Sequence, residues 1–426
     1  MHLAPFRSRT LFGASAVISG ILLLASGSTF AAKQQADDRI VAAVNQFAPQ
    51  IIEYRHQIHQ NPELGNREFE TSALVAEHLR SLGIEVTTGI AHTGVVGILE
   101  GGRPGPVVAV RADMDALPVT EETPYPFKST VRTTYLNKEV GVMHACGHDI
   151  HTAVQMGVAS VLASMRDELP GTVKFIFQPA EERAPGGAIS MIKGQAINGV
   201  DSIIGSHVLP KMAPGKVAIK YGAIAATVEL IEITLEGEGG HTSRPNESVD
   251  LIWAQSQLVH FLEQSLNHGI DRQEPVVLAF GKIEGGTTHN VLPNKVKLFG
   301  TLRYLNPDIK DVLYEKINDS IKNVMNLSSA KIQWKSNYAC PGVVNDDKIT
   351  DLVYNSAREA IGEDNVELLD ISSMGGEDFA YYLQRIPGTY FRIGSFDGEC
   401  KDIHTSDFDV DENCIFTGIK VYSSII

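Results

Sequence analysis

The sequence of 426 residues has few cysteines, two tryptophans and a shortage of basic side chains. Four cysteines are too few for a disulfide scaffold, which excludes the small disulfide-rich classes. The 36 Lys and Arg residues face 51 Asp and Glu residues, and the resulting formal charge of −15 argues against broad binding to nucleic acids or anionic membranes. Hydrophobic residues at 43% and charged residues at 20% are ordinary for a globular protein, and the length allows two or three domains.

The only long apolar run lies at the N-terminus. Arg7 and Arg9 precede an uncharged stretch whose apolar centre is 11–25, and Thr29-Phe30-Ala31 supplies the small residues of a cleavage site. We therefore predict a signal peptide over 1–31 and a periplasmic or secreted mature protein. The alternative is an uncleaved membrane anchor, since the run is just long enough to cross a bilayer.

Export to an oxidising compartment bears on the cysteines. Cys400 and Cys414 are close enough in sequence to form a disulfide there, which would leave Cys340 as a free thiol.

Helix-like and strand-like segments alternate in the two outer parts of the mature chain, which predicts an α/β fold with a mainly parallel sheet. The apolar periodicity predicts helices over 40–54, 72–82, 151–165 and 348–361, strands over 84–88, 95–99, 107–110, 173–177, 202–205 and 390–393, and a loop over 56–69.

A middle segment has a different order of elements. The pattern there predicts strand, helix, two strands, helix and strand, over 228–235, 249–266, 276–280, 295–304, 309–325 and 331–336. This order is typical of the split βαβ sandwich. We predict a catalytic domain formed by 36–221 and 339–426, interrupted by an inserted α+β domain over 222–338.

The strongest chemical signal is the run Cys146-Gly147-His148-Asp149-Ile150-His151. A thiolate and an imidazole on either side of a glycine can face one borderline-soft cation. The alternative is a buried thiol beside a histidine at the start of a helix, and the pair alone does not decide between them.

Further polar side chains follow predicted strands. Glu181 and Glu182 come after strand 173–177, where open α/β sheets place functional groups, although adjacent carboxylates are more often a solvated pair. The other candidates are His207, placed after strand 202–205, His404 in a C-terminal loop, and Asp113 and Asp115 after strand 107–110, for which capping is the alternative.

Several of these residues lie in motifs that resemble the binuclear metal aminoacylase/carboxypeptidase family, in the branch of hippurate hydrolases, N-acyl-L-amino-acid amidohydrolases and auxin-conjugate hydrolases. The motifs occur in order from about His56 to Asp409. They are Arg111-Ala112-Asp113-Met114-Asp115-Ala116-Leu117-Pro118, the Cys146–His151 run, Gln178-Pro179-Ala180-Glu181-Glu182, Gly239-Gly240-His241, Gly285-Gly286-Thr287-Thr288-His289-Asn290-Val291-Leu292-Pro293 and Met374-Gly375-Gly376-Glu377-Asp378-Phe379.

The resemblance implies a site with two divalent metal ions per subunit. The implied ligands are Cys146, His148, Glu182, His207 and His404, and the implied general base is Glu181. Two nearby cations can share a water, lower its pKa and polarise a carbonyl, while a neighbouring carboxylate moves the proton to the leaving amine. Thiolate and imidazole suit zinc, and manganese, cobalt or nickel accept the same ligands.

The resemblance also gives the inserted domain a role. It implies a homodimer joined through this domain, in which His241 reaches the partner subunit's active site and supports the developing oxyanion. Asn290 and Arg303 would hold the substrate's carboxylate, although Arg303 also fits an ordinary surface position on a strand. The sequence departs from the family pattern at 242–245 and 287–289, near the expected substrate pocket.

The expected activity is hydrolysis of N-acyl-L-amino acids, hippurate-like substrates included, to a carboxylic acid and an amino acid. A dipeptidase or carboxypeptidase with the same metal site is the alternative within this class. A non-catalytic periplasmic binding protein would not need Glu181, and a thiol hydrolase would use Cys146 as its nucleophile.

Overall fold

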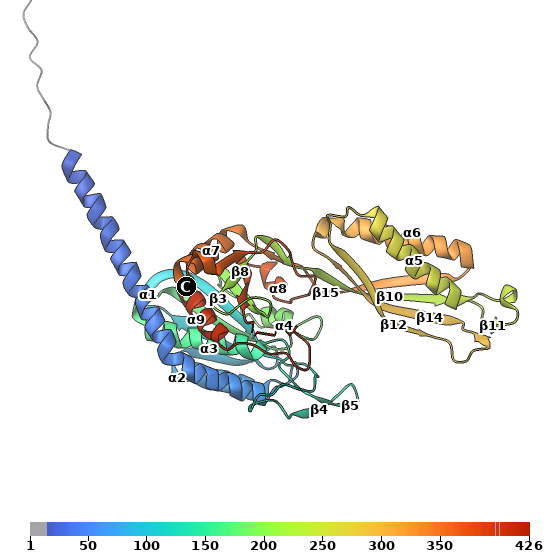
Figure 1. The fold of residues 1–426 in the computed structure, drawn as a ribbon, viewed down its shortest axis with the longest axis horizontal. Helices are drawn as coiled ribbons and strands as arrows, with labels where there is room; N and C mark the ends of the chain where they lie inside the picture. The colour runs from blue at the N-terminus through green and yellow to red at the C-terminus, as the bar shows by residue number, and fades with distance from the viewer. Residues whose placement is uncertain (1–14, 397, 400) are drawn as a thin grey trace, which may run out of the picture.

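The computed structural model describes residues 15–396, 398–399 and 401–426 (Figure 1). Its body is built on an eight-stranded sheet. A four-stranded sheet, which belongs to the inserted unit, lies beside the body at the end opposite the long N-terminal helix. In spatial order the large sheet comprises β1 (Glu85–Ile90), β2 (Gly94–Glu100), β6 (Pro170–Gln178), β3 (Arg103–Asp113), β7 (Ser202–Leu209), β18 (Gly388–Gly394), β8 (Val217–Ile219) and β17 (Val366–Leu368).

The central strands β6, β3, β7 and β18 run parallel, and antiparallel pairs lie toward the edges. The predicted fold class, a mainly parallel α/β catalytic domain with an inserted split βαβ unit, is confirmed. The parallel arrangement matters for function because the carboxyl ends of β6, β3 and β7 meet at one edge of the sheet.

Helices cover both faces of this sheet. In β6, Val173, Phe175 and Phe177 pack toward one core while Ile176 packs toward the other, as the two-residue period of a strand requires. The first core includes α1 (Ser15–Gln60), α2 (Phe69–Ser81), α3 (His148–Ser164), α7 (Asp347–Ile361) and α9 (Asn413–Ile425), and the second includes α4 (Ala188–Lys193) and α8 (Ala380–Leu383).

The inserted unit has its own sheet and its own core. Its strands follow the order β12-β14-β10-β15, all antiparallel, with two helices packed on one face. The elements are β10 (Thr227–Glu236), α5 (Leu251–Gly269), β12 (Val276–Gly285), β14 (Lys295–Tyr304), α6 (Lys310–Ser328) and β15 (Lys331–Cys340), with a short pair β11 (Gly240–His241) and β13 (Val291–Leu292). The domain limits at 222 and 338 stay a prediction.

Short strand pairs complete the fold. β9 (Gly222–Ala225) pairs with β16 (Val343–Asn345) where the chain enters and leaves the inserted unit, and β4 (Arg132–Tyr135) pairs with β5 (Lys138–Gly141).

Three predictions of local structure are wrong. The loop expected from residue 56 begins only after Gln60, because Ile51, Arg55 and Ile58 of α1 are buried on one side of a continuous helix. Helix α3 begins at His148 rather than three residues later. His207 lies inside β7, which continues to Leu209 alongside β18.

The predicted disulfide is contradicted at Cys414. This thiol is free and fully buried in α9, packed into the main core, while Cys400 lies outside the described residues. Cys340 is free, as predicted. Residues 1–14 of the predicted leader also lie outside the description. Within the described part of the chain, no helix combines the length and apolarity that crossing a membrane requires.

Candidate active site

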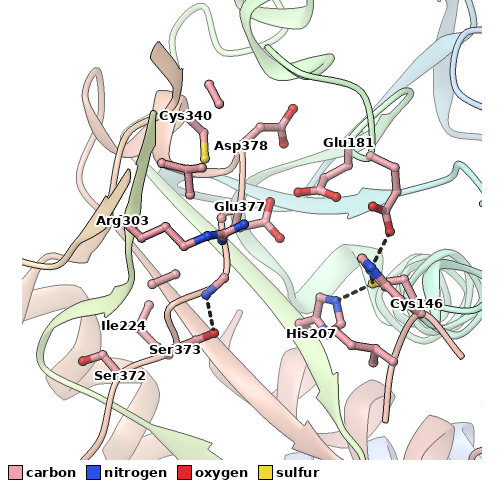
Figure 2. A pocket seen from close by; sticks show the side chains of 18 of the residues that line it. Cys146, Glu181, His207, Ile224, Arg303, Cys340, Ser372, Ser373, Glu377 and Asp378 are labelled. Atoms are coloured by element: carbon pink, nitrogen blue, oxygen red, sulfur yellow. Dashed lines mark hydrogen bonds and ion pairs between the residues drawn. The ribbon is translucent and has the colours of Figure 1, made fainter. Parts of the chain in front are cut away.

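Four of the five predicted ligands meet at a buried thiol. The Cys146 sulfur lies 3.3 Å from Nε2 of His207 and 3.3 Å from Nε2 of His404, and that His404 nitrogen lies 3.1 Å from the Glu182 carboxylate (Figure 2). Cys146 precedes α3, Glu182 follows β6 and His207 lies near the end of β7, so one helix and two strands on either side of β3 bring them together. His404 joins them because its backbone N–H donates to the carbonyl of Ala145.

His148, the fifth predicted ligand, completes the cluster. Its side chain is 1% exposed, its Nδ1–H donates to the Asp115 carbonyl at 2.8 Å, and its Nε2 has no hydrogen-bond partner. Ligand atoms of Cys146, His148 and His207 lie within 4.8 Å of one another, as do those of His148, Glu181 and Glu182.

The tautomers of two imidazoles suit metal ligation. His207 donates its Nδ1–H to the Val208 carbonyl at 2.8 Å, and His148 donates its Nδ1–H to the Asp115 carbonyl, so Nε2 is the nitrogen that each ring can offer to a cation. Burial lowers the pKa of His207 well below its usual value, which keeps that ring neutral. A buried unpartnered imidazole nitrogen beside a thiol and a carboxylate fits a borderline divalent cation.

Charge on the remaining ligands couples to cation binding. Burial raises the pKa of the Cys146 thiol, and hydrogen bonds with Cys146 and Glu182 raise the pKa of His404 to about 10. Burial opposes protonation of His148, but the charge of Asp113 outweighs it and raises the pKa of His148 well above its usual value. A cation bound here would have to displace the protons of all three groups, so its affinity would increase with pH.

The adjacent carboxylates have opposite environments. Burial, Glu377 and Glu182 together raise the pKa of Glu181 well above its ordinary value. Burial also opposes ionisation of Glu182, but the hydrogen bond with His404 and the charge of His148 outweigh it and lower the pKa. Glu182 therefore belongs with the ligands, whereas Glu181 faces Glu377 and Asp378 across the site.

His151 and Asp113 lie at the site but are held by protein groups. His151 donates Nδ1–H to Asp113 at 2.6 Å and accepts the Val208 N–H at Nε2, so both ring nitrogens are used. Asp113 also pairs with the buried Arg111 at 2.6 Å. These two side chains orient the cluster from behind rather than contribute ligands.

A cavity of about 740 Å³ opens in front of the cluster (Figure 2). Cys146, Glu181, Glu182, His207 and His404 line one side. The opposite side belongs partly to the inserted unit and is largely apolar, with Ile224, Val228, Leu230, Leu369 and Ile371.

Arg303 projects from β14 into this cavity, so it does not occupy the ordinary surface position that was the alternative for this residue. Its Nη1 donates to the carbonyl of Met374 at 2.8 Å, in the loop that leads to Glu377. A guanidinium held this way is suited to a carboxylate.

His241 and Asn290 do not line this cavity within the described residues. They lie side by side at the β11–β13 pair, at the far end of the inserted unit (Figure 1). Both are exposed. The Ser243 N–H donates to Nδ1 of His241 at 3.1 Å, so Nε2 carries the proton of the neutral ring and can act as a donor.

Two further carboxylates support the site. Sequence reasoning left the role of Asp115 open between a functional carboxylate and a turn cap, and the structure shows that its carboxylate accepts the backbone N–H groups of Glu181 and Glu182. Sequence reasoning did not single out Glu68, which is fully buried and accepts the N–H of Ala180. The position of Asp115 within a motif was a signal, but Glu68 is distant in sequence from every candidate.

Comparison with known proteins agrees with this geometry. Residues 109–426 match the family model Peptidase family M20/M25/M40. The chain is 37% identical over 370 residues to an N-acetyl-L-cysteine deacetylase of Bacillus subtilis, covering 86% of this chain and 85% of that protein. It is also 37% identical over 388 residues to thermostable carboxypeptidase 1 of Saccharolobus solfataricus, covering 89% and 95%.

Solved structures show the same fold. A dinuclear metal-binding peptidase of the M20 family from Bacillus subtilis superimposes with a TM-score of 0.77 at 31% identity, covering 89% of this chain and 97% of that one. The site and the fold define a hydrolase of amide bonds. The chain belongs to the peptidase family M20/M25/M40, and the predicted class of enzyme, a metal-dependent amidohydrolase, is confirmed with it.

Proposed function

We propose that this protein hydrolyses the amide bond of N-acyl-L-amino acids, hippurate-like compounds included, with two divalent metal ions per subunit. One observation carries the proposal. The carboxylate of Glu181 lies beside the five candidate ligand side chains without being one of them. The cavity at these residues also contains Arg303.

Each residue has a distinct part in the reaction. Cys146, His148, Glu182, His207 and His404 would hold the metals, which supply an acidified water and polarise the scissile carbonyl. Glu181 takes the proton of the water and gives it to the leaving amine. Arg303 binds the substrate's carboxylate, and the apolar side of the cavity receives its hydrocarbon part.

The inserted unit supplies the remaining groups in this proposal. The protein would be a homodimer joined through the inserted domain, with His241 and Asn290 of one subunit completing the other subunit's site. Their distance from the cavity of their own chain and the proton on His241 Nε2 support this arrangement.

Location and metal identity are also part of the proposal. The leader-like N-terminus supports a periplasmic or secreted protein with residues 1–31 removed. N-terminal sequencing should then begin near Ala32, whereas Met1 in a membrane fraction would contradict it. Zinc or manganese fits the ligand set, with cobalt or nickel as alternatives.

A substrate panel distinguishes this activity from that of a dipeptidase or carboxypeptidase with the same metal site. N-acetyl and N-benzoyl amino acids should be cleaved in preference to unblocked dipeptides, and metal analysis of the same sample should give two ions per chain. Preference for dipeptides would favour the carboxypeptidase-like alternative, which relatives with that name support. The raised pKa of Cys146 argues against a thiol nucleophile.

A further inference from the structure

The turn that carries Glu181 and Glu182 is held by two other carboxylates. Three consecutive backbone N–H groups, from Ala180 to Glu182, each donate to a side-chain oxygen. The Ala180 N–H donates to Glu68 at 2.9 Å, and the next two donate to the two oxygens of Asp115 at 2.9 and 3.0 Å.

This arrangement brings acidic groups close to one another. Asp115 is 1% exposed and Glu68 is fully buried, near a site that already contains Glu181 and Glu182. Burying carboxylates here is costly unless they are hydrogen-bonded. Each of the two carboxylates accepts at least one backbone N–H of the turn, so the turn supplies part of the hydrogen bonding that both require.

Asp115 also reaches a ligand on another element. Its backbone carbonyl accepts Nδ1–H of His148 at 2.8 Å, while its carboxylate accepts the two N–H groups of the turn. One residue just beyond the end of β3 thus contacts both a ligand on α3 and the turn after β6.

Glu68 anchors the other end of the turn. One carboxylate oxygen accepts the N–H of Asn66 and Ala180 at 2.9 Å each, and the other accepts the Thr93 hydroxyl at 2.6 Å. Ala180 has a φ of +57°, in the left-handed region that disfavours side chains, so the hydrogen bond holds a backbone conformation that would otherwise relax.

We infer that Asp115 and Glu68 are positioning residues that hold the 180–182 turn, so that Glu182 points at the metal ligands while its neighbour Glu181 stays free as the base. This inference rests on the proposed function for the role of Glu181, but its metal-binding part is independent of the substrate.

The test compares variants of the full-length protein. Asp115→Asn keeps the shape but turns one acceptor into an amide donor that faces a backbone N–H. Glu68→Ala removes both acceptors, whereas Glu68→Gln keeps a carbonyl oxygen for Asn66 and Ala180. The matched control is Glu63→Ala, because the Glu63 carboxylate accepts the N–H groups of Glu70 and Thr71 at the start of α2 and none of the N–H groups of the turn.

Two quantities are measured, the Zn²⁺ affinity of metal-free protein by chelator competition and the kinetic constants at saturating metal. We expect Asp115→Asn and Glu68→Ala to weaken Zn²⁺ binding by about 10–100-fold. We also expect kcat to fall by about 10–100-fold, with KM changed by less than about threefold, because the base is displaced rather than the substrate pocket. Glu68→Gln should stay within about threefold of the wild type in both.

Thermal unfolding separates positioning from general stability. Glu63→Ala should lower the melting temperature without changing Zn²⁺ affinity or kcat. If Asp115→Asn and Glu68→Ala behave as Glu63→Ala does, the two carboxylates are only structural and the inference is wrong. Wild-type protein that binds Zn²⁺ but cleaves no N-acyl-amino acid would instead overturn the proposed function, while the Zn²⁺ affinities would still report on the turn.

Discussion

At the scale of single residues, adjacent side chains have different tasks because their surroundings differ. Glu182 lies 3.1 Å from His404, and hydrogen bonding and positive charge keep its pKa low. Glu181 is buried and lies near the carboxylates of Glu377 and Glu182, and all three effects raise its pKa. The positive charge of metal ions bound by the five ligands would lower the Glu181 pKa toward its ordinary range. The ability of Glu181 to act as a base is therefore linked to metal occupancy.

Exchange of each carboxylate for its amide should give different defects. Glu181→Gln keeps the size of the side chain but cannot take a proton, so kcat should fall by about 10²–10⁴-fold. Metal content, measured by elemental analysis, should stay at the wild-type value. Glu182→Gln is the matched control and should lose metal and activity together. Loss of metal from Glu181→Gln with retention in Glu182→Gln would show that the two roles are reversed.

Cys146, His148, Glu182 and Glu181 could be predicted from sequence because they lie in motifs of distinctive residue types, whereas His207 and His404 lie outside those motifs and were predicted only from the order of the family resemblance along the chain. The exclusion of His151 could not, since the motif contains two histidines and only the structure shows that both nitrogens of His151 are used. The same holds for Glu68, because its role depends on a backbone N–H far away in the chain.

At the scale of elements, the start of α3 positions two ligands at once. Gly147 separates Cys146 from His148 and has a φ of +85°, which turns the chain from the loop into the helix. A Cβ at this position would lie 2.6 Å from Cγ2 of Val208, next to His207. The glycine is therefore required both by the backbone angle and by the close approach of β7.

Gly147→Ala should disrupt the site as well as lower stability. The left-handed backbone should cost about 1–3 kcal/mol of unfolding free energy, measured by denaturant titration. The clash with Val208 should in addition move ligands and weaken Zn²⁺ binding. Gly215→Ala is the control, because Gly215 has a φ of +86° but a Cβ added there would have no neighbouring atom within 4 Å, so this variant should lose stability alone. Equal Zn²⁺ affinity in both variants would contradict this account.

Periodicity predicted most elements of the sheet and of the inserted unit, since buried apolar side chains repeat at strand or helix spacing. It failed where polar residues are buried. The end of α1 was predicted as part of a loop that contains Asn61-Pro62 and Gly65, but Arg55 and His59 continue the helix and are buried against Asp149, at 2.9 and 2.8 Å. His207 likewise looked like the end of a strand, although β7 continues past it.

At the scale of the whole molecule, the two parts of the proposed site are separated within one chain. The ligand cluster lies in the body, while β11 lies at the far end of the inserted unit (Figure 1). The order of motifs along the chain indicated both sets of residues, but no sequence pattern encodes the distance between them. A second subunit that brings its His241 to the cavity would resolve this separation.

Mixed dimers test whether His241 acts on the partner subunit. A histidine that donates to the carbonyl oxygen as it gains charge contributes mainly in the transition state, so His241→Ala should lower kcat by about 10²–10³-fold. Asn290→Ala should instead raise KM, because it would contact a carboxylate present throughout the reaction. His241→Ala and Glu181→Gln subunits are each nearly inactive alone and are combined after dissociation.

If His241 acts on the partner, one site of each mixed dimer carries both defects and the other carries none. Random reassociation of equal amounts should then restore about one quarter of wild-type activity, since half of the dimers are mixed and each has one intact site. If His241 acts within its own chain, every site lacks one group, and activity should stay at the level of the two parents. A mixture of His241→Ala with itself through the same dissociation controls for recovery caused by refolding. Sedimentation analysis of the mixture must show dimers, because a monomeric protein would exclude sharing of the site altogether.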